Sequence, residues 1–269
     1  MKIIAILKKI KHKLRKYQFN YYKTIIANFK LFPFKQAIHF PLVIYNRVEL
    51  KLSNSKITLN VPPKFALIRW GLNQDLFTPS NTASMLLMIN GEIIINGYIR
   101  ISPGCVFRII NGKLNLGKYN SLGGGSKLLC NNKIYIDDYS RFGFGSILCD
   151  TNFHYINHNG IIVNCNGEIK IGKSIFVGNN SSIVKGAIIP DYSIISSKSY
   201  VNKDFSEFQN GALIAGAPAK ILKEGYRRIS SPKLEEKIKT YFDSHKEDKH
   251  YIISEEDIDN PEDMNIYYL

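Results

Sequence analysis

The sequence predicts an all-β fold, a parallel β-helix coiled from six-residue repeats, on two observations. First, six aliphatic residues follow one another at a spacing of six: Ile171, Val177, Ile183, Ile189, Ile195 and Val201. Second, the positions four residues later are mostly small: Ile175, Ser181, Ala187, Ser193 and Ser199. A period of six fits neither an α-helix nor an ordinary strand. A coil with three flat faces per turn explains both, because each face turns one aliphatic inward and small residues fit the tight corners.

In such a coil, each inward residue stacks on its counterpart about 18 residues later. We therefore expect three stacked pairs: Ile171 on Ile189, Val177 on Ile195, and Ile183 on Val201. The spacing of six continues upstream in two sets separated by a slip of two residues: Ile136, Phe142 and Leu148, and before them Leu116, Leu122 and Leu128. The 23 residues from Leu148 to Ile171 are not a multiple of six, which predicts an insertion around residues 149–168. Loops that interrupt a rigid scaffold often carry function.

The composition divides the chain into four parts. Residues 1–30 have the pattern of a basic amphipathic helical extension. Residues 31–110 hold short period-two segments, whose strands either begin the coil, cap it or form a small separate domain that grips the acceptor. A cap is favoured, because an open coil end would expose unpaired strand edges. Residues 111–224 form the repeat domain, and residues 225–269 are expected to form a charged C-terminal helix and tail.

The charge balance favours anionic partners. The 269 residues include 36 basic and 22 acidic ones, a net charge of +14, which suits phosphorylated cofactors, acidic polymers or a lipid surface. No nucleic-acid-binding module accompanies this charge, so nucleic acid is not an expected partner. The N-terminal helix either makes a peripheral contact with the inner face of a membrane or packs on the protein body. Without a spanning segment or a secretory core, a cytoplasmic location is expected.

The four cysteines show no paired spacing. Neither a disulfide framework nor a metal site is therefore expected. Cys149 and Cys165 flank the predicted insertion, and we interpret them as small core residues rather than catalytic thiols.

Two strings at the end of the repeat are specific: IKIGKSIFVGNNSSIVKGAIIPDYSIISSKSYVNKD and AGAPAKILK. They resemble the terminal coil and closing segment of the hexapeptide-repeat acyltransferases, within the maltose, galactoside and polysaccharide O-acetyltransferase branch. The resemblance is clear over residues 134–224 and faint over 90–133. It implies a left-handed coil, a homotrimer, and acetyl-CoA bound in the groove between neighbouring subunits. The left hand departs from the usual crossover rule and comes from the resemblance alone.

The resemblance places the catalytic histidine at His154, in the inserted string CDTNFHYINHNG. Acetyl transfer to an alcohol needs a base, because a hydroxyl is a poor nucleophile until its proton is removed, and neutral imidazole suits that task. The second ring nitrogen then needs an acceptor. Asp150 and Asn152 are the nearest candidates, with Glu168 as a more distant alternative. No nucleophile motif points to a covalent intermediate.

Coenzyme A has a pantetheine arm, a pyrophosphate and a 3′-phosphate, so its site should combine an apolar groove, backbone amides and cations. By motif position, the resemblance implies eight binding residues: Gly178, Asn179, Ser196, Ser197, Asn202, Lys203, Lys220 and Lys223. Phe176 replaces a tryptophan of many relatives, and Asn179 a glycine or serine. The stretch FSEFQNGAL also departs from the usual short, proline-rich loop.

The function expected first is an acetyl-CoA-dependent O-acetyltransferase of a sugar hydroxyl, acting in the biosynthesis of a surface polysaccharide such as capsule or lipopolysaccharide. An N-acetyltransferase of an amino sugar is the alternative within the same class, because the same base would serve an amine acceptor. A non-catalytic β-helix scaffold is the alternative from another class. His154 and the AGAPAK segment argue against the scaffold.

Overall fold

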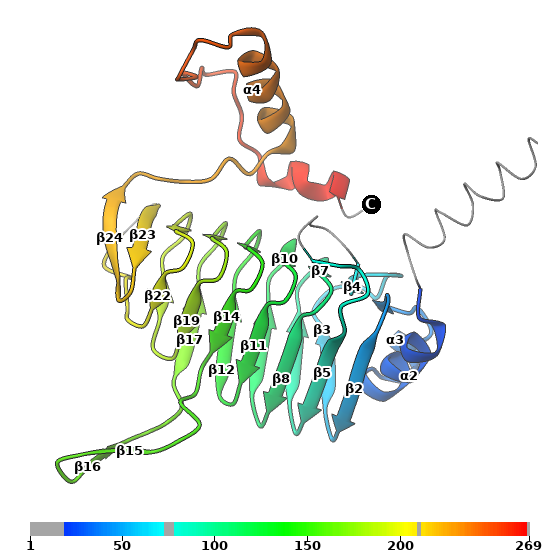
Figure 1. Cartoon of the computed structure of the whole chain (residues 1–269). Helices are drawn as coiled ribbons and strands as arrows, with labels where there is room; N and C mark the ends of the chain where they lie inside the picture. The colour runs from blue at the N-terminus through cyan, green and yellow to red at the C-terminus, as the bar shows by residue number, and fades with distance from the viewer. Residues whose placement is uncertain (1–18, 73–77, 209–210, 268–269) are drawn as a thin grey trace, which may run out of the picture.

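The structure is a computed structural model, and it describes residues 19–72, 78–208 and 211–267. Three strand-built faces wind around one core (Figure 1). The first face, in spatial order, consists of β1 (Leu42–Ile44), β4 (Ile68–Trp70), β7 (Ile99–Ile101), β10 (Asn120–Leu122), β13 (Arg141–Phe142), β18 (Phe176–Val177), β21 (Ile194–Ile195), β23 (Ala212–Gly216) and β24 (Ala219–Glu224).

The second face consists of β2 (Val48–Ser53), β5 (Ser84–Ile89), β8 (Val106–Ile110), β11 (Lys127–Cys130), β14 (Ile147–Cys149), β19 (Ser182–Val184) and β22 (Tyr200–Val201). The third face consists of β3 (Lys56–Leu59), β6 (Glu92–Ile95), β9 (Lys113–Leu116), β12 (Lys133–Ile136), β17 (Glu168–Ile171) and β20 (Ile188–Ile189). The chain visits the faces in this order, and we name the corners between them 1–2, 2–3 and 3–1. Neighbouring strands run parallel, apart from the antiparallel pair β23 and β24 that ends the first face.

The core is a set of stacked inward side chains, as the spacing of six predicts. The three predicted pairs are confirmed, since Ile171 pairs with Ile189, Val177 with Ile195, and Ile183 with Val201, and all six are buried. Upstream turns are longer, which explains the slip in the sequence pattern. Leu116 pairs with Ile136, 20 residues on, and Ile95 pairs with Leu116, 21 residues on.

The small residues at the corners are also explained. The Ser146 hydroxyl donates to the Gly143 carbonyl at 2.8 Å, and the Ser199 hydroxyl donates to the Ser196 carbonyl at 2.7 Å. Both serines are fully buried or nearly so. A serine therefore fits the narrow corner and also satisfies a carbonyl that the sharp bend leaves without a strand partner.

Residues 31–110 contribute the first turns of the coil, so their strands are not the separate cap that the sequence favoured. The N-terminal end is covered instead by helix α2 (Tyr21–Leu31), followed by the short helix α3 (Phe34–Ala37). The Asn28 side chain donates to the Leu42 carbonyl at 2.6 Å and accepts from the Leu42 amide at 3.1 Å, while the Thr24 hydroxyl accepts from the Ile44 amide at 3.0 Å. Helix α2 thereby satisfies the open edge of β1, the end strand of the first face.

The basic helix expected over residues 1–30 falls largely outside the described residues, which begin at Phe19. Helix α2 starts after Asn20, whose side chain accepts from the Lys23 amide at 3.0 Å, as a helix N-cap does. No helix in the described ranges is long and apolar enough to cross a membrane.

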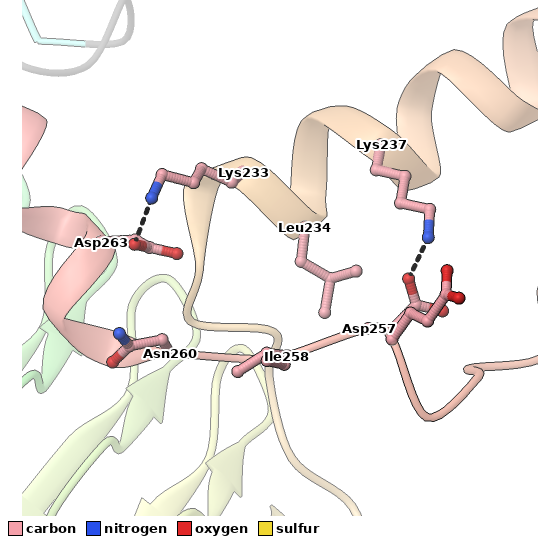
Figure 2. A pocket seen from close by; sticks show the side chains of 8 residues that line it. Lys233, Leu234, Lys237, Asp257, Ile258, Asn260 and Asp263 are labelled. Carbon is pink, nitrogen blue, oxygen red and sulfur yellow. Dashed lines mark hydrogen bonds and ion pairs between the residues drawn. The ribbon is translucent and has the colours of Figure 1, made fainter.

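The C-terminal extension consists of helix α4 (Pro232–Ser244) and the 3₁₀ helix η1 (Pro261–Tyr267). Figure 2 shows the hollow between them, about 340 Å³ in volume, and the ion pairs on its rim. Lys237 Nζ lies 2.5 Å from Asp257 Oδ1, and Lys233 Nζ lies 2.9 Å from Asp263 Oδ1. These ion pairs hold the charged segment in its folded form. The residues that line the hollow therefore stabilise the extension.

Candidate active site

The insertion predicted around residues 149–168 leaves the coil at corner 2–3, between β14 and β17. It is a hairpin of β15 (Ile156–His158) and β16 (Ile161–Val163), which projects away from the coil in Figure 1. We call residues 150–167 the arm. Its base is a short ladder, because the Asn152 amide donates to the Cys165 carbonyl and the Gly167 amide donates to the Asp150 carbonyl, both at 2.8 Å.

His154 lies just beyond this ladder and is exposed to solvent. The residue before it, Phe153, has a left-handed backbone (φ 61°), and its amide donates to the Thr151 hydroxyl at 3.0 Å. The Phe153 ring lies 5.0 Å from the guanidinium of Arg108 on β8, and that guanidinium also donates to Asn131 Oδ1 at 2.7 Å. Arg108 therefore anchors the segment that carries His154. The sequence pattern did not predict this contact between Arg108 and Phe153.

The acceptors predicted for the His154 ring are engaged elsewhere. Asp150 is fully buried, and its two oxygens accept from the amides of Asn131 and Asn132 at 2.7 and 2.9 Å. Burial raises the pKa of the Asp150 carboxyl, while those two amides oppose the rise. Its carboxylate therefore closes the corner in the preceding turn, and the expected contact with His154 is absent within one chain.

The other two candidates do not orient His154 either. Asn152 is exposed and contributes its backbone to the arm's base ladder. Glu168 pairs with Lys133 at 2.9 Å and Lys170 at 3.0 Å, and the hydrogen bond from Lys133 lowers the pKa of its carboxyl. Among the residues that the structure describes, the His154 ring makes no hydrogen bond.

The two cysteines at the arm's base, Cys149 and Cys165, were predicted to be core residues. In the structure they are half-buried and lie outside the core. Cys149 Sγ lies 3.0 Å from the Thr151 carbonyl oxygen, and burial raises the pKa of its thiol. A thiol held protonated is a poor nucleophile, so Cys149 is not suited to be a catalytic nucleophile. In the described parts of the chain, no group of three His, Cys, Asp or Glu side chains is arranged to hold a metal ion.

Four of the predicted coenzyme residues meet at corner 1–2. Gly178 and Asn179 follow β18, and Ser196 and Ser197 follow β21 in the next turn. A Cβ on Gly178 would lie 2.4 Å from the Ser197 nitrogen, so only glycine allows the two turns to approach this closely. Asn179 Oδ1 accepts from the Phe144 amide at 3.1 Å. Gly178 and Asn179 therefore also shape the corner itself.

The other four predicted coenzyme residues are divided. Asn202 and Lys203 follow β22 at corner 2–3, two turns beyond the arm. Lys220 and Lys223 are exposed on β24, and Lys220 pairs with Ala215 of β23, next to Ile214, whose carbonyl accepts from the Ser196 amide. The stretch FSEFQNGAL places Phe205 in the core at the end of the coil, with the Lys203 ammonium 5.0 Å from its ring. Within a single chain, Asn202 and Lys203 therefore lie at a different corner from Gly178, Asn179, Ser196 and Ser197, whereas Lys220 lies near Ser196.

No family model matches the sequence. The carnitine operon protein CaiE of Salmonella agona (strain SL483) is 26% identical over 136 residues, which are 50% of this chain and 59% of that protein. The chain therefore matches only part of this relative's length.

Several solved structures resemble the fold. The polySia-specific acetyltransferase NeuO has a TM-score of 0.54 and 19% identity, covering 75% of this chain and 94% of that chain. The polysialic acid O-acetyltransferase OatWY has a TM-score of 0.44 and 21% identity, covering 71% and 99%. AntD, an N-acyltransferase from Bacillus cereus, has a TM-score of 0.43 and 15% identity, covering 76% and 89%.

The likeness to NeuO covers three quarters of this chain. Together with the three parallel faces, it shows that this chain has the left-handed parallel β-helix fold of the hexapeptide-repeat acyltransferases.

Proposed function

We propose that this protein is an acetyl-CoA-dependent O-acetyltransferase of a sugar hydroxyl, with His154 as the general base. The observation that carries the proposal is the place of His154, exposed on an anchored arm that interrupts an acyltransferase-type coil. The imidazole removes the hydroxyl proton as the oxygen attacks the thioester carbonyl. The carbon–sulfur bond then breaks, an acetyl ester forms, and the released coenzyme A thiolate takes up the proton.

The proposed site is shared between subunits. In one chain, the arm leaves corner 2–3, whereas Gly178, Asn179, Ser196 and Ser197 lie at corner 1–2. The arm also exposes several apolar side chains: Tyr155, Ile156, Ile161, Ile162 and Val163. Exposed apolar groups on a projecting hairpin favour burial against another surface. These observations support the homotrimer, in which one subunit's base would serve coenzyme bound at its neighbour.

The proposed acceptor is a sugar of a surface polysaccharide or of its lipid-linked precursor. The net charge of +14 favours an acidic acceptor, and NeuO, which has the same fold, is described as specific for a polymer of sialic acid. Synthesis of such glycans on lipid carriers is consistent with a cytoplasmic enzyme that touches the inner membrane face through its basic N-terminal segment.

The test is the rate of coenzyme A release from acetyl-CoA with a panel of neutral and acidic sugars. Release should depend on the acceptor and fall about 100-fold or more in His154→Ala, the loss typical of a missing general base. His158→Ala, on the same exposed arm, is the matched control and should keep the native rate.

The product distinguishes the alternatives. Mild alkali removes an acetyl ester and leaves an amide, so an alkali-stable product would replace the O-acetyltransferase with an N-acetyltransferase. A chain that binds no acetyl-CoA in a titration would favour the non-catalytic scaffold. An unchanged rate in His154→Ala would remove His154 from the mechanism.

A further inference from the structure

Corner 3–1 carries a column of tyrosines that the proposed chemistry does not use. Tyr98, Tyr119 and Tyr139 occupy equivalent positions in three successive turns, just before β7, β10 and β13. Their rings are stacked, with centroids 6.0 Å apart for the first pair and 5.7 Å for the second, and interplanar angles of 22° and 21°. The column is an aromatic strip along one edge of the coil.

The backbone at this corner is unfavourable for such large side chains. Tyr119 and Tyr139 have φ angles of 59° and 62°, in the left-handed region that glycine and asparagine occupy more readily. Ring stacking offsets part of that cost. Stacking alone does not account for the two lysines and the glutamate that also lie at this corner, Lys118, Lys173 and Glu262.

A carboxylate already occupies the end of the strip. The Tyr139 hydroxyl donates to Glu262 Oε1, and Lys118 Nζ lies 2.5 Å from the same oxygen. Tyr139 is only 3% exposed, so its hydroxyl is a buried and directed donor. The Lys118 and Lys173 ammonium groups lie 5.1 and 5.6 Å from the Tyr139 ring centroid. The hydrogen bond from Lys118 lowers the pKa of Glu262, which keeps the group ionised. Tyr139, Lys118 and Lys173 thus form a binding site for one carboxylate, which we call the carboxylate seat.

A hollow of about 230 Å³ lies beside this seat. Its walls include Val61, Pro62, Lys64, Tyr98, Lys118 and Tyr119. Lys118 belongs both to the hollow and to the carboxylate seat, so the two are adjacent. Aromatic and apolar walls suit the C–H face of a sugar ring, while ammonium groups suit a carboxylate.

We propose that corner 3–1 binds a carboxylate-bearing saccharide, and that Glu262 of the C-terminal extension occupies its carboxylate seat in this structure. The seat rests on the observed geometry, whereas the choice of a saccharide as ligand rests on the proposed function. The arm leaves a different corner, so this site holds an acidic glycan away from the reacting hydroxyl. The extension competes with that glycan for the same two donors, Lys118 and Tyr139.

The test is calorimetric binding of two acidic tetrasaccharides, one of galacturonate and one of hyaluronan, to the full chain without acetyl-CoA, with neutral maltotetraose for comparison. Glu262→Gln removes the competing charge and keeps the side-chain shape. At least one acidic tetrasaccharide should bind about tenfold more tightly to this variant than to the native chain, as expected when one charge-assisted competitor is lost. Adding Lys118→Met or Tyr139→Phe to Glu262→Gln should abolish that gain.

Glu236→Gln is the matched control, because it removes one negative charge from exposed α4 without touching the corner. It should leave the affinity unchanged. The proposal is overturned if neither acidic tetrasaccharide binds Glu262→Gln, or if maltotetraose binds this variant as tightly as the acidic tetrasaccharides do. It is also overturned if the double variants bind the acidic tetrasaccharides as tightly as Glu262→Gln does. Binding is measured without acetyl transfer. A protein that binds the acidic tetrasaccharides but transfers no acetyl group would therefore contradict only the proposed function and not this proposal.

Discussion

The coil and the arm use the same residue types in opposite ways. In the coil, Ile183 is fully buried between Leu148 and Val201. In the arm, Ile161 and Ile162 are 66% and 62% exposed. Burial within the coil stabilises it, whereas the described residues leave the arm's apolar side chains exposed, and we propose that a neighbouring subunit covers them. The comparison separates a buried scaffold from an arm that is left exposed.

The largest expected effect is on the coil. Ile183→Ala removes a fully buried side chain from the centre of three stacked turns, and we expect the free energy of unfolding to fall by about 2–5 kcal/mol. Urea unfolding followed by circular dichroism measures the change.

Ile162→Ala on the arm is the matched variant. It should change the unfolding free energy of the isolated chain by no more than about 0.5 kcal/mol, because the side chain is exposed there. It should instead weaken self-association in sedimentation velocity. Equal stability losses at both positions would contradict the separation of coil and arm.

A smaller effect is expected where the coil anchors the arm. Arg108→Ala removes the cation over the Phe153 ring and the hydrogen bond to Asn131. If Arg108 positions His154, kcat should fall about tenfold, the value of one such anchoring contact, while the KM for acetyl-CoA stays unchanged. Lys51→Ala, an exposed cation on the same face, is the control. A raised KM with an unchanged kcat would show that Arg108 contacts the coenzyme instead.

The smallest effect is on the C-terminal extension. Because Lys118 lowers the folded-state pKa of Glu262, their contact stabilises the extension above the unfolded-state pKa and is lost as the pH falls through the folded value. Asp257 and Asp263 also have lowered pKa values, so their ion pairs weaken in the same direction.

Hydrogen exchange measured from pH 7 down to about pH 3 checks this. Exchange in the extension should quicken relative to the intrinsic rate at each pH, while the coil strands stay protected. In Glu262→Gln, η1 should already be less protected at pH 7. Equal protection of η1 at both ends of the range would contradict the role of Glu262.

The sequence predicted the regular coil and its small corner residues, but not the side-chain contacts made at the corners. The three stacked pairs followed from the spacing of six, because every turn repeats the same local geometry. Asp150 shows the limit of such reasoning. It is close to His154 in sequence, yet its carboxylate turns into the coil, where this buried group accepts hydrogen bonds from the amides of Asn131 and Asn132.

By itself, the sequence determined the repeat, the place of the insertion and, through family resemblance, the candidate base. Each of those features is visible along one continuous stretch of the sequence. Only the tertiary structure decided that α2 covers the coil end, that Arg108 contacts Phe153, and that Glu262 reaches Lys118. These contacts join residues far apart in the chain. Which of these residues come into contact depends on how the whole chain folds, and the spacing of six does not specify it.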